Sequence, residues 1–153
     1  MSAGLDGVDL PLGWRWSQLR HVTTVLHRGT APEYVDEGPV HVVGQASNRN
    51  GVIDWSRTRF HAYGGDVRRL KGHLRERDVL VNSTGTGTLG RVAFYSGSAD
   101  MRPSVADGHI TIVRCRTDEL DSRFLFYYLA SQSFRDFMMS ALVSGATNQI
   151  ELS

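Results

Sequence analysis

The spacing of the apolar residues changes once along this chain, at about Asp121, and this change constrains the fold more than any other feature. Before it, the apolar stretches are short and either rich in β-branched residues or alternating with polar residues, which is typical of strands. After it, apolar residues recur three and four positions apart, which predicts an amphipathic helix from about Ser122 that is broken or bent near 131–133 and ends before Gly145. The sequence therefore predicts an α+β fold with a C-terminal helical segment.

The strand at 78–82 is the clearest, because three apolar residues lie between polar ends. A loop rich in glycine and threonine, residues 83–91, joins it to a second strand at 92–95, so we expect a hairpin or a corner there. Residues 66–77 have few apolar side chains, and we expect mostly a connecting segment. Further strands are expected at 21–26, 40–45, 51–55, 58–63 and 108–116.

The 153 residues show neither an internal repeat nor a linker, so we expect a single domain spanning 1–153. With 41% hydrophobic and 9% aromatic residues, the composition excludes a disordered protein. No apolar run approaches the about 18–20 residues that cross a bilayer, and the acidic N-terminus is unlike a signal peptide. The single cysteine, Cys115, forms no internal disulfide, and we therefore expect a cytoplasmic protein.

The positive charge of the chain is concentrated in its middle. Residues 49–77 contain seven arginines and one lysine against three acidic residues, whereas the segments on either side each carry a net charge of −2. Sixteen of the seventeen basic residues are arginine, whose planar guanidinium suits phosphates and guanine edges, although a GC-rich genome would also favour arginine codons. Codon usage does not explain the clustering, so the middle segment indicates a polyanionic partner.

The loop at 83–91 leaves three interpretations open. It is not a Walker A loop, because it contains no lysine and precedes a strand rather than a helix. Its GxGxxG pattern at 85–90 also lacks the following helix of a dinucleotide site, so an enzyme that uses this loop for a nucleotide is the least favoured interpretation. The others are a structural turn and a hydroxyl-rich loop that faces a nucleic-acid backbone, with Arg91 behind it.

No other segment indicates a catalytic centre, a cofactor or a metal site. The six histidines show no HxxxH or HExxH spacing, one cysteine cannot build a zinc site, and no GxSxG nucleophile motif is present. Asp107 and His109 are explained more simply by the turn before a strand. The amides near 145–149 could recognise adenine, but we favour a role in satisfying backbone groups after the helix. We expect a non-catalytic protein.

Five motifs occur in a distinctive order: LPLGWRW at 10–16, RGTAPEY at 28–34, DVLVNSTGTGTLGR at 78–91, VADGHITIVR at 105–114 and GATNQIEL at 145–152. In this order they resemble the target recognition domain of type I restriction-modification specificity subunits. The resemblance extends from about Leu10 to Ser153. It implies a mixed, highly twisted sheet of short strands with flanking helices.

The resemblance also implies a function in defence against foreign DNA. A specificity subunit of this family carries two recognition domains, each recognising half of a split DNA sequence, while separate subunits methylate adenine or translocate and cleave DNA. The implied partners are double-stranded DNA, the methyltransferase subunit, the restriction subunits, and either a second copy or a second recognition domain; no membrane is involved. The family's spacer helix follows each recognition domain, and we expect this chain to end at Ser153 without it.

From the basic segment and its neighbours we predict two groups of DNA-contacting residues. Cations for phosphate or guanine are Arg28, Arg49, Arg57, Arg59, Arg68, Arg69, Lys71 and Arg91. Hydroxyl and amide groups nearby are Tyr34, Asn48, Asn50, Ser83, Thr84, Thr86 and Thr88. The alternative is a protein-interaction or assembly subunit of a defence complex that does not itself recognise DNA. It would use one side of the terminal helix, namely Tyr127, Tyr128, Phe137, Met138 and Met139, unless that helix is buried on both sides.

Overall fold

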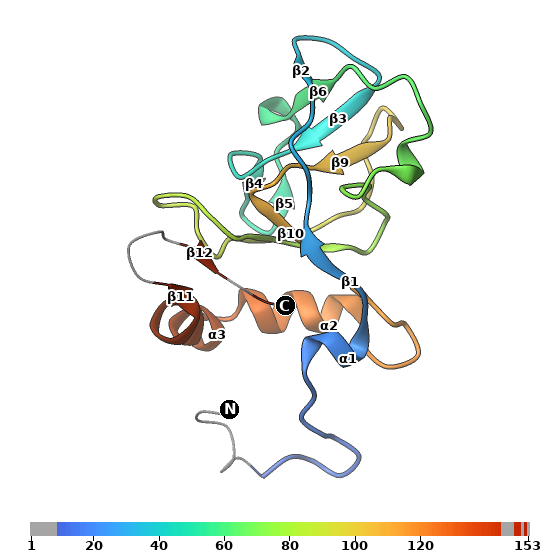
Figure 1. Ribbon diagram of the computed structural model, residues 1–153. Coiled ribbons are helices and arrows are strands. Elements are labelled where there is room, and N and C mark those ends of the chain that lie inside the picture. Colours follow the sequence, from blue (N-terminus) through green and yellow to red (C-terminus); the bar gives the residue numbers. More distant parts are fainter. Residues whose placement is uncertain (1–8, 145–148, 151, 153) are drawn as a thin grey trace.

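The structure is a computed structural model that describes residues 9–144, 149–150 and 152. Within these residues, the strands form two four-stranded sheets and two short two-stranded pairs, and the main helices lie together at the end of the molecule opposite strands β2, β3 and β6 (Figure 1). The predicted α+β class with a mixed sheet and C-terminal helices is confirmed. No helix in the described part of the chain is both long and apolar enough to cross a membrane.

The first sheet is antiparallel throughout and has the strand order β1-β10-β7-β8. Its central strand β7 is buried on both sides, because Leu80 packs toward the other sheet while Val79 and Val81 pack toward the helices. The predicted hairpin is confirmed, since the loop at 83–91 joins β7 directly to its antiparallel neighbour β8. The strands are β1 (Thr23–Arg28), β7 (Val79–Asn82), β8 (Val92–Phe94) and β10 (Ile110–Cys115).

The second sheet is mixed and has the order β2-β6-β3-β9, in which only β3 and β9 run parallel. Val43 of β3 and Ala106 of β9 join Leu80 and Ile110 in one buried cluster, so the two sheets share a core. Its strands are β2 (Tyr34–Val35), β3 (Val40–Val43), β6 (Arg59–His61) and β9 (Ser104–Ala106), and the short pairs are β4 (Asn48–Arg49) with β5 (Val52–Ile53) and β11 (Val143–Ser144) with β12 (Gln149–Ile150).

The helical segment begins where the sequence predicts. The side chain of Asp121 accepts hydrogen bonds from the N–H groups of Arg123 and Phe124, which caps α2 (Ser122–Ala130). The predicted break is confirmed at Ser131, whose hydroxyl donates to the Tyr128 carbonyl and accepts from the Phe134 N–H. The chain continues as α3 (Gln132–Phe137) and a π-helical turn, η3 (Met138–Leu142).

The first predicted strand lies two residues later than expected, and the strands expected at 40–45, 51–55, 58–63, 92–95 and 108–116 are shorter than predicted. The segment 21–26 begins as a helical turn, α1 (Leu19–Val22), because the Thr23 hydroxyl bonds back to the Leu19 carbonyl, and the strand starts only at Thr23. The segment 51–55 ends at Ile53, because Asp54 caps a 3₁₀ turn, η1 (Trp55–Arg57). The predicted connection at 66–77 is confirmed and contains one further 3₁₀ turn, η2 (Val67–Arg69).

Candidate nucleic-acid interface

A half-open hollow of about 130 Å³ lies beside the ends of β3 and β9 in the mixed sheet. Three of the predicted DNA-contacting residues meet there, although they come from β2, η1 and β6. The hollow is lined by Tyr34, Val42, Gly44, Gln45, Ala46, Arg57, Arg59 and Asp107.

The register of the mixed sheet places Tyr34 and Arg59 on the same face. Arg59 lies opposite Val42, while His61 lies opposite both Val40 and Tyr34, and directly paired residues share a face of a sheet. The Arg59 guanidinium carbon lies 3.9 Å from the centre of the Tyr34 ring, a cation–π contact. The strand pairing therefore creates an exposed cation stacked on an aromatic ring.

Asp107 joins this pair from the end of β9. Its Oδ2 accepts a hydrogen bond from the Tyr34 hydroxyl at 3.2 Å, and its Oδ1 accepts one from the His109 N–H at 2.8 Å. Burial, followed by the negative charge of Asp107, raises the pKa of Tyr34 to about 12, so the phenol keeps its proton. A Cβ at position 44 would lie 2.7 Å from Asp107 Oδ2, so a larger residue there would displace this carboxylate.

The glycine- and threonine-rich loop is tied to the same region through Gln45. The Asn82 side chain donates to the carbonyls of Gln45 and Thr88, at 3.1 and 2.9 Å, and the Thr88 hydroxyl donates to Gln45 Oε1 at 3.3 Å. Gly85, Gly87 and Gly90 all have positive φ values, which explains the glycines of this turn. The structural-turn interpretation therefore accounts for the glycines of this loop. The exposed Thr86 lies near the tip of the loop.

The loop also meets the end of the chain. Thr84 forms a β-bridge with Gln149, and its hydroxyl lies 2.6 Å from His109 Nδ1. Two segments that the sequence singled out independently are thus adjacent. The rest of the amide-containing motif, residues 145–148, lies outside the described residues.

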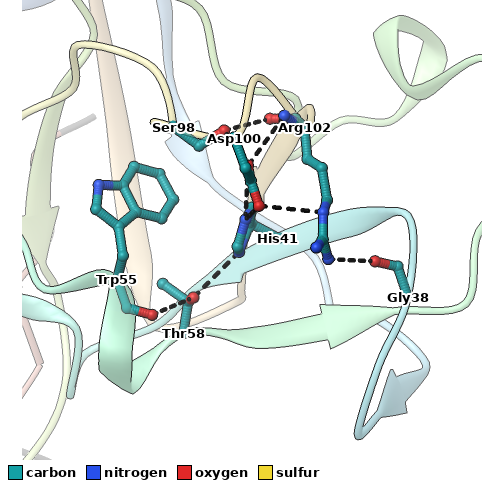
Figure 2. A network of polar contacts seen from close by, with 7 residues as sticks. All are labelled: Gly38, His41, Trp55, Thr58, Ser98, Asp100 and Arg102. Carbon is teal, nitrogen blue, oxygen red and sulfur yellow. Dashed lines mark hydrogen bonds and ion pairs between the residues drawn. The ribbon is translucent and has the colours of Figure 1, made fainter.

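A polar network on the opposite face of the mixed sheet holds the segment that carries Arg57 and Arg59 (Figure 2). His41 lies between two partners: its Nδ1 is 3.1 Å from the Thr58 hydroxyl, and its Nε2 is 2.9 Å from a carboxylate oxygen of Asp100. The Thr58 hydroxyl is also within hydrogen-bonding distance, 2.9 Å, of the Trp55 carbonyl. The hydrogen bonds that Asp100 accepts, first from His41 and then from the Arg102 N–H, lower its pKa to about 2.

Arg102 completes the network in Figure 2. Its Nε lies 3.1 Å from Asp100 Oδ2, and it donates to the Gly38 carbonyl at 3.0 Å. The network links the loop before β9 to the start of β3 and to Thr58, which lies between the two arginines of the hollow. None of these residues was predicted to have a role at the site.

Two predicted DNA-contacting residues are corrected by their burial. Asn48 is fully buried and donates to the carbonyls of Leu80 and Arg91, both at 3.2 Å. Ser83 is fully buried and pairs with the Thr111 hydroxyl. Both side chains are committed to the core, so their roles are structural.

The other predicted residues do not line the hollow. The 67–71 segment covers the same face of the sheet, since Val67 packs against Val40 and Val42, and it leaves Arg69 and Lys71 exposed. Exposed Arg68, in the same turn, forms an ion pair with Asp66. Elsewhere, Arg28 ends β1 half-buried, Arg49 and Asn50 form the β4–β5 turn, and Arg91 donates to the Gly87 carbonyl.

The described residues contain no group of three or more His, Cys, Asp or Glu side chains that could hold a metal ion. The hollow offers guanidinium, phenol, amide and carboxylate groups, which suit recognition by hydrogen bonding.

Comparison with known proteins gives structural matches only. No model of a protein family matches the chain, and no curated protein matches its sequence. A chain from a structural study of complex assembly and conformational transition of the type I R-M system has a TM-score of 0.64 and 18% identity, over 94% of this chain and 36% of its own length. The crystal structure of the HsdS subunit from Thermoanaerobacter tengcongensis has a TM-score of 0.63 and 22% identity, over 95% and 34%.

These matches show a similarity of fold. The chain spans about a third of the length of the solved chains that it matches. The predicted resemblance to one recognition domain of a type I specificity subunit is confirmed as a similarity of fold over about 95% of the chain.

Proposed function

We propose that this chain binds double-stranded DNA in a sequence-specific manner, as the target recognition module of a type I restriction-modification system or a related defence system. The observation that carries the proposal is the hollow in which Tyr34, Arg57 and Arg59 meet, in a fold similar to that of an HsdS subunit. Exposed arginines can bind phosphates, and arginine is also the side chain best suited to guanine in the major groove.

The positive charge of the middle segment supports the proposal that the chain binds DNA. Residues 49–77 include η1, β6 and η2, so much of their excess positive charge lies on or beside one face of the mixed sheet. The Arg59 guanidinium contacts the Tyr34 ring and forms no ion pair or hydrogen bond with any residue that the structure describes. Its N–H donors are therefore available to a ligand.

The proposal includes the setting of the module. It acts as one recognition domain over 1–153, has no catalytic residues of its own, and works in the cytoplasm with the methyltransferase and restriction subunits. A second recognition domain or a second copy of the chain supplies the other half of the DNA site and raises the overall affinity.

A second candidate function, protein interaction without DNA recognition, is favoured by a largely exposed aromatic row that runs from Trp14 along α2 and α3. The rings of Trp14, Phe124, Tyr128, Phe134 and Phe137 follow one another with centroid distances of 5.3 to 6.4 Å. Of the residues predicted for this surface, Tyr127, Tyr128, Phe137 and Met139 are exposed, whereas Met138 is fully buried and belongs to the core. Large exposed apolar surfaces commonly mark interaction sites.

Selection from a randomised duplex pool at two salt concentrations tests the proposal. Enrichment of one short motif by the purified chain would support a recognition module. Retention of DNA without enrichment would leave only a basic surface and would contradict sequence recognition. No retention at low salt, together with tight binding of a protein partner, would favour the second candidate.

A further inference from the structure

Tyr34 and Arg59 form one preorganised unit at the hollow. The Arg59 guanidinium carbon lies over the Tyr34 ring, 3.9 Å from its centre, and Tyr34 remains 37% exposed. A stacked guanidinium loses less conformational freedom when it binds, and its planar fork keeps its edge available for hydrogen bonds. The two polar groups of the unit are thus held side by side before any ligand arrives.

Asp107 determines which way the Tyr34 hydroxyl points its proton. A carboxylate can only accept, so the hydrogen bond between Oδ2 and the hydroxyl requires the Tyr34 proton to point inward. The raised pKa of Tyr34, about 12, keeps that proton on the phenol at neutral pH. Toward the hollow, the Tyr34 oxygen therefore offers lone pairs and no proton.

Asp107 is itself fixed in place. It is 6% exposed, its second oxygen accepts from the His109 N–H at 2.8 Å, and Gly44 leaves room for the carboxylate. It is almost fully buried in the wall of the hollow, and we assign it a role through Tyr34 as a positioning residue.

We infer that Tyr34 and Arg59 recognise one G·C base pair in the major groove, with Asp107 as the positioning residue; the inference rests on the proposed DNA-binding function. Guanine presents two acceptors, O6 and N7, to the Arg59 fork, and the paired cytosine presents the N4 amino donor to the Tyr34 oxygen. An A·T pair fits less well, because adenine offers the fork only N7 and places an amino group beside it.

Three site variants of the full chain, Arg59→Ala, Tyr34→Phe and Asp107→Asn, and one control test the inference in the randomised-duplex selection. Arg59→Ala should lower the G·C preference at one position by about 5- to 150-fold, the range for a bidentate contact. Tyr34→Phe should lower it at the same position by about 2- to 10-fold, the range for one hydrogen bond. Arg20→Ala removes one charge from α1 and should leave every position unchanged.

Asp107→Asn gives the sharpest readout. The His109 N–H still needs an acceptor, so the new amide oxygen faces it and the amide N–H₂ faces Tyr34. The Tyr34 hydroxyl must then accept from the amide and turn its proton outward, which repels the cytosine amino group. The G·C preference should fall at the same position, and Asp107→Asn should have no further effect in a Tyr34→Phe background.

The outcomes separate the inference from the proposed function. The inference is supported if Arg59→Ala, Tyr34→Phe and Asp107→Asn all lower the G·C preference at one shared position. It also requires that Asp107→Asn has no further effect in the Tyr34→Phe background. A wild-type motif that all three site variants keep, or that they change at different positions, overturns the inference and leaves DNA recognition standing. A wild type that enriches no motif overturns the proposed function and the inference with it. If Asp107→Asn fails to fold by thermal melting, the exposed Tyr34→Phe and Arg59→Ala changes still decide the outcome.

Discussion

The carboxylate of Asp78 is fully buried and accepts two hydrogen bonds from the Arg114 guanidinium, from Nε at 2.8 Å and from Nη2 at 2.7 Å. The same carboxylate accepts from the Arg75 N–H, and Arg114 also donates to the His73 carbonyl. This ion pair joins the start of β7 to β10 and attaches the basic connecting segment to the antiparallel sheet. It fixes the end of that segment at residues 73–75, while Val67 packs the segment onto the mixed sheet.

Arg114→Ala is expected to lower the free energy of unfolding by about 3–5 kcal/mol, because it leaves the Asp78 charge buried and unpaired. Denaturant unfolding provides the measurement. Arg15→Ala is the matched control, since Arg15 forms an exposed ion pair with Glu119, and such pairs contribute about 1 kcal/mol or less. Equal losses in the two variants would show that the buried pair has no special role.

Gly29→Ala is expected to lower the free energy of unfolding by about 2 kcal/mol or more, because the added Cβ would overlap the backbone carbonyl of Ala106. Gly29 is buried where β1 ends and donates to the Ile110 carbonyl at 3.0 Å, so the backbone cannot move aside easily. Thermal or denaturant unfolding would detect the loss. Gly64→Ala, where no atom lies within 4 Å of the added Cβ, should change stability by about 0.5 kcal/mol or less.

The parts of the fold that the sequence predicted are those with strong local signals. The strand at 78–82 was visible because Val79, Leu80 and Val81 are buried on both sides of the sheet. The helix start at Asp121 was visible because a capping side chain precedes a periodic apolar pattern. Strand β9, with only three residues, has no such pattern, and its parallel partner β3 lies about 60 positions earlier in the chain.

The site was predicted only in part for the same reason. Arg57, Arg59 and Tyr34 were identified by residue type and by the basic cluster, but nothing local indicated that they share a hollow with Asp107. Asp107 was assigned to a turn, and its bond to His109 confirms that local role. Its second partner, Tyr34, is 73 positions away, a relationship that exists only after the sheets have formed.

The contribution of Asp100 to stability is expected to depend on pH. Its pKa is lowered from 3.8 to about 2, first through the hydrogen bond with His41. A carboxyl group whose pKa is depressed in the folded state stabilises the fold above its unfolded pKa, and that contribution is lost as the pH falls toward the folded value. The wild type should therefore be more stable than Asp100→Asn at pH 5 to 6, and the difference should shrink between about pH 4 and 2.

Denaturant unfolding of both proteins across this pH range measures the effect. Asp9→Asn is a suitable control, because Asp9 is exposed and forms no hydrogen bond or ion pair with another described residue. A difference between the wild type and Asp100→Asn that stays constant from pH 6 to pH 2 would contradict the prediction.

The salt dependence of DNA binding measures how many of the predicted basic residues contact phosphates. If six basic residues neutralise phosphates, the logarithm of the binding constant should fall with the logarithm of salt concentration with a slope of about −5. The double change Arg68→Ala and Arg69→Ala should weaken that slope by up to about two, because both side chains are exposed beside the hollow.

Arg68 must exchange its ion pair with Asp66 for a phosphate, so Asp66→Asn should strengthen binding slightly at low salt. Replacing the buried Ser83 with alanine should leave the slope unchanged. A double variant with the wild-type slope would remove Arg68 and Arg69 from the interface and would limit phosphate binding to the other cations around the hollow.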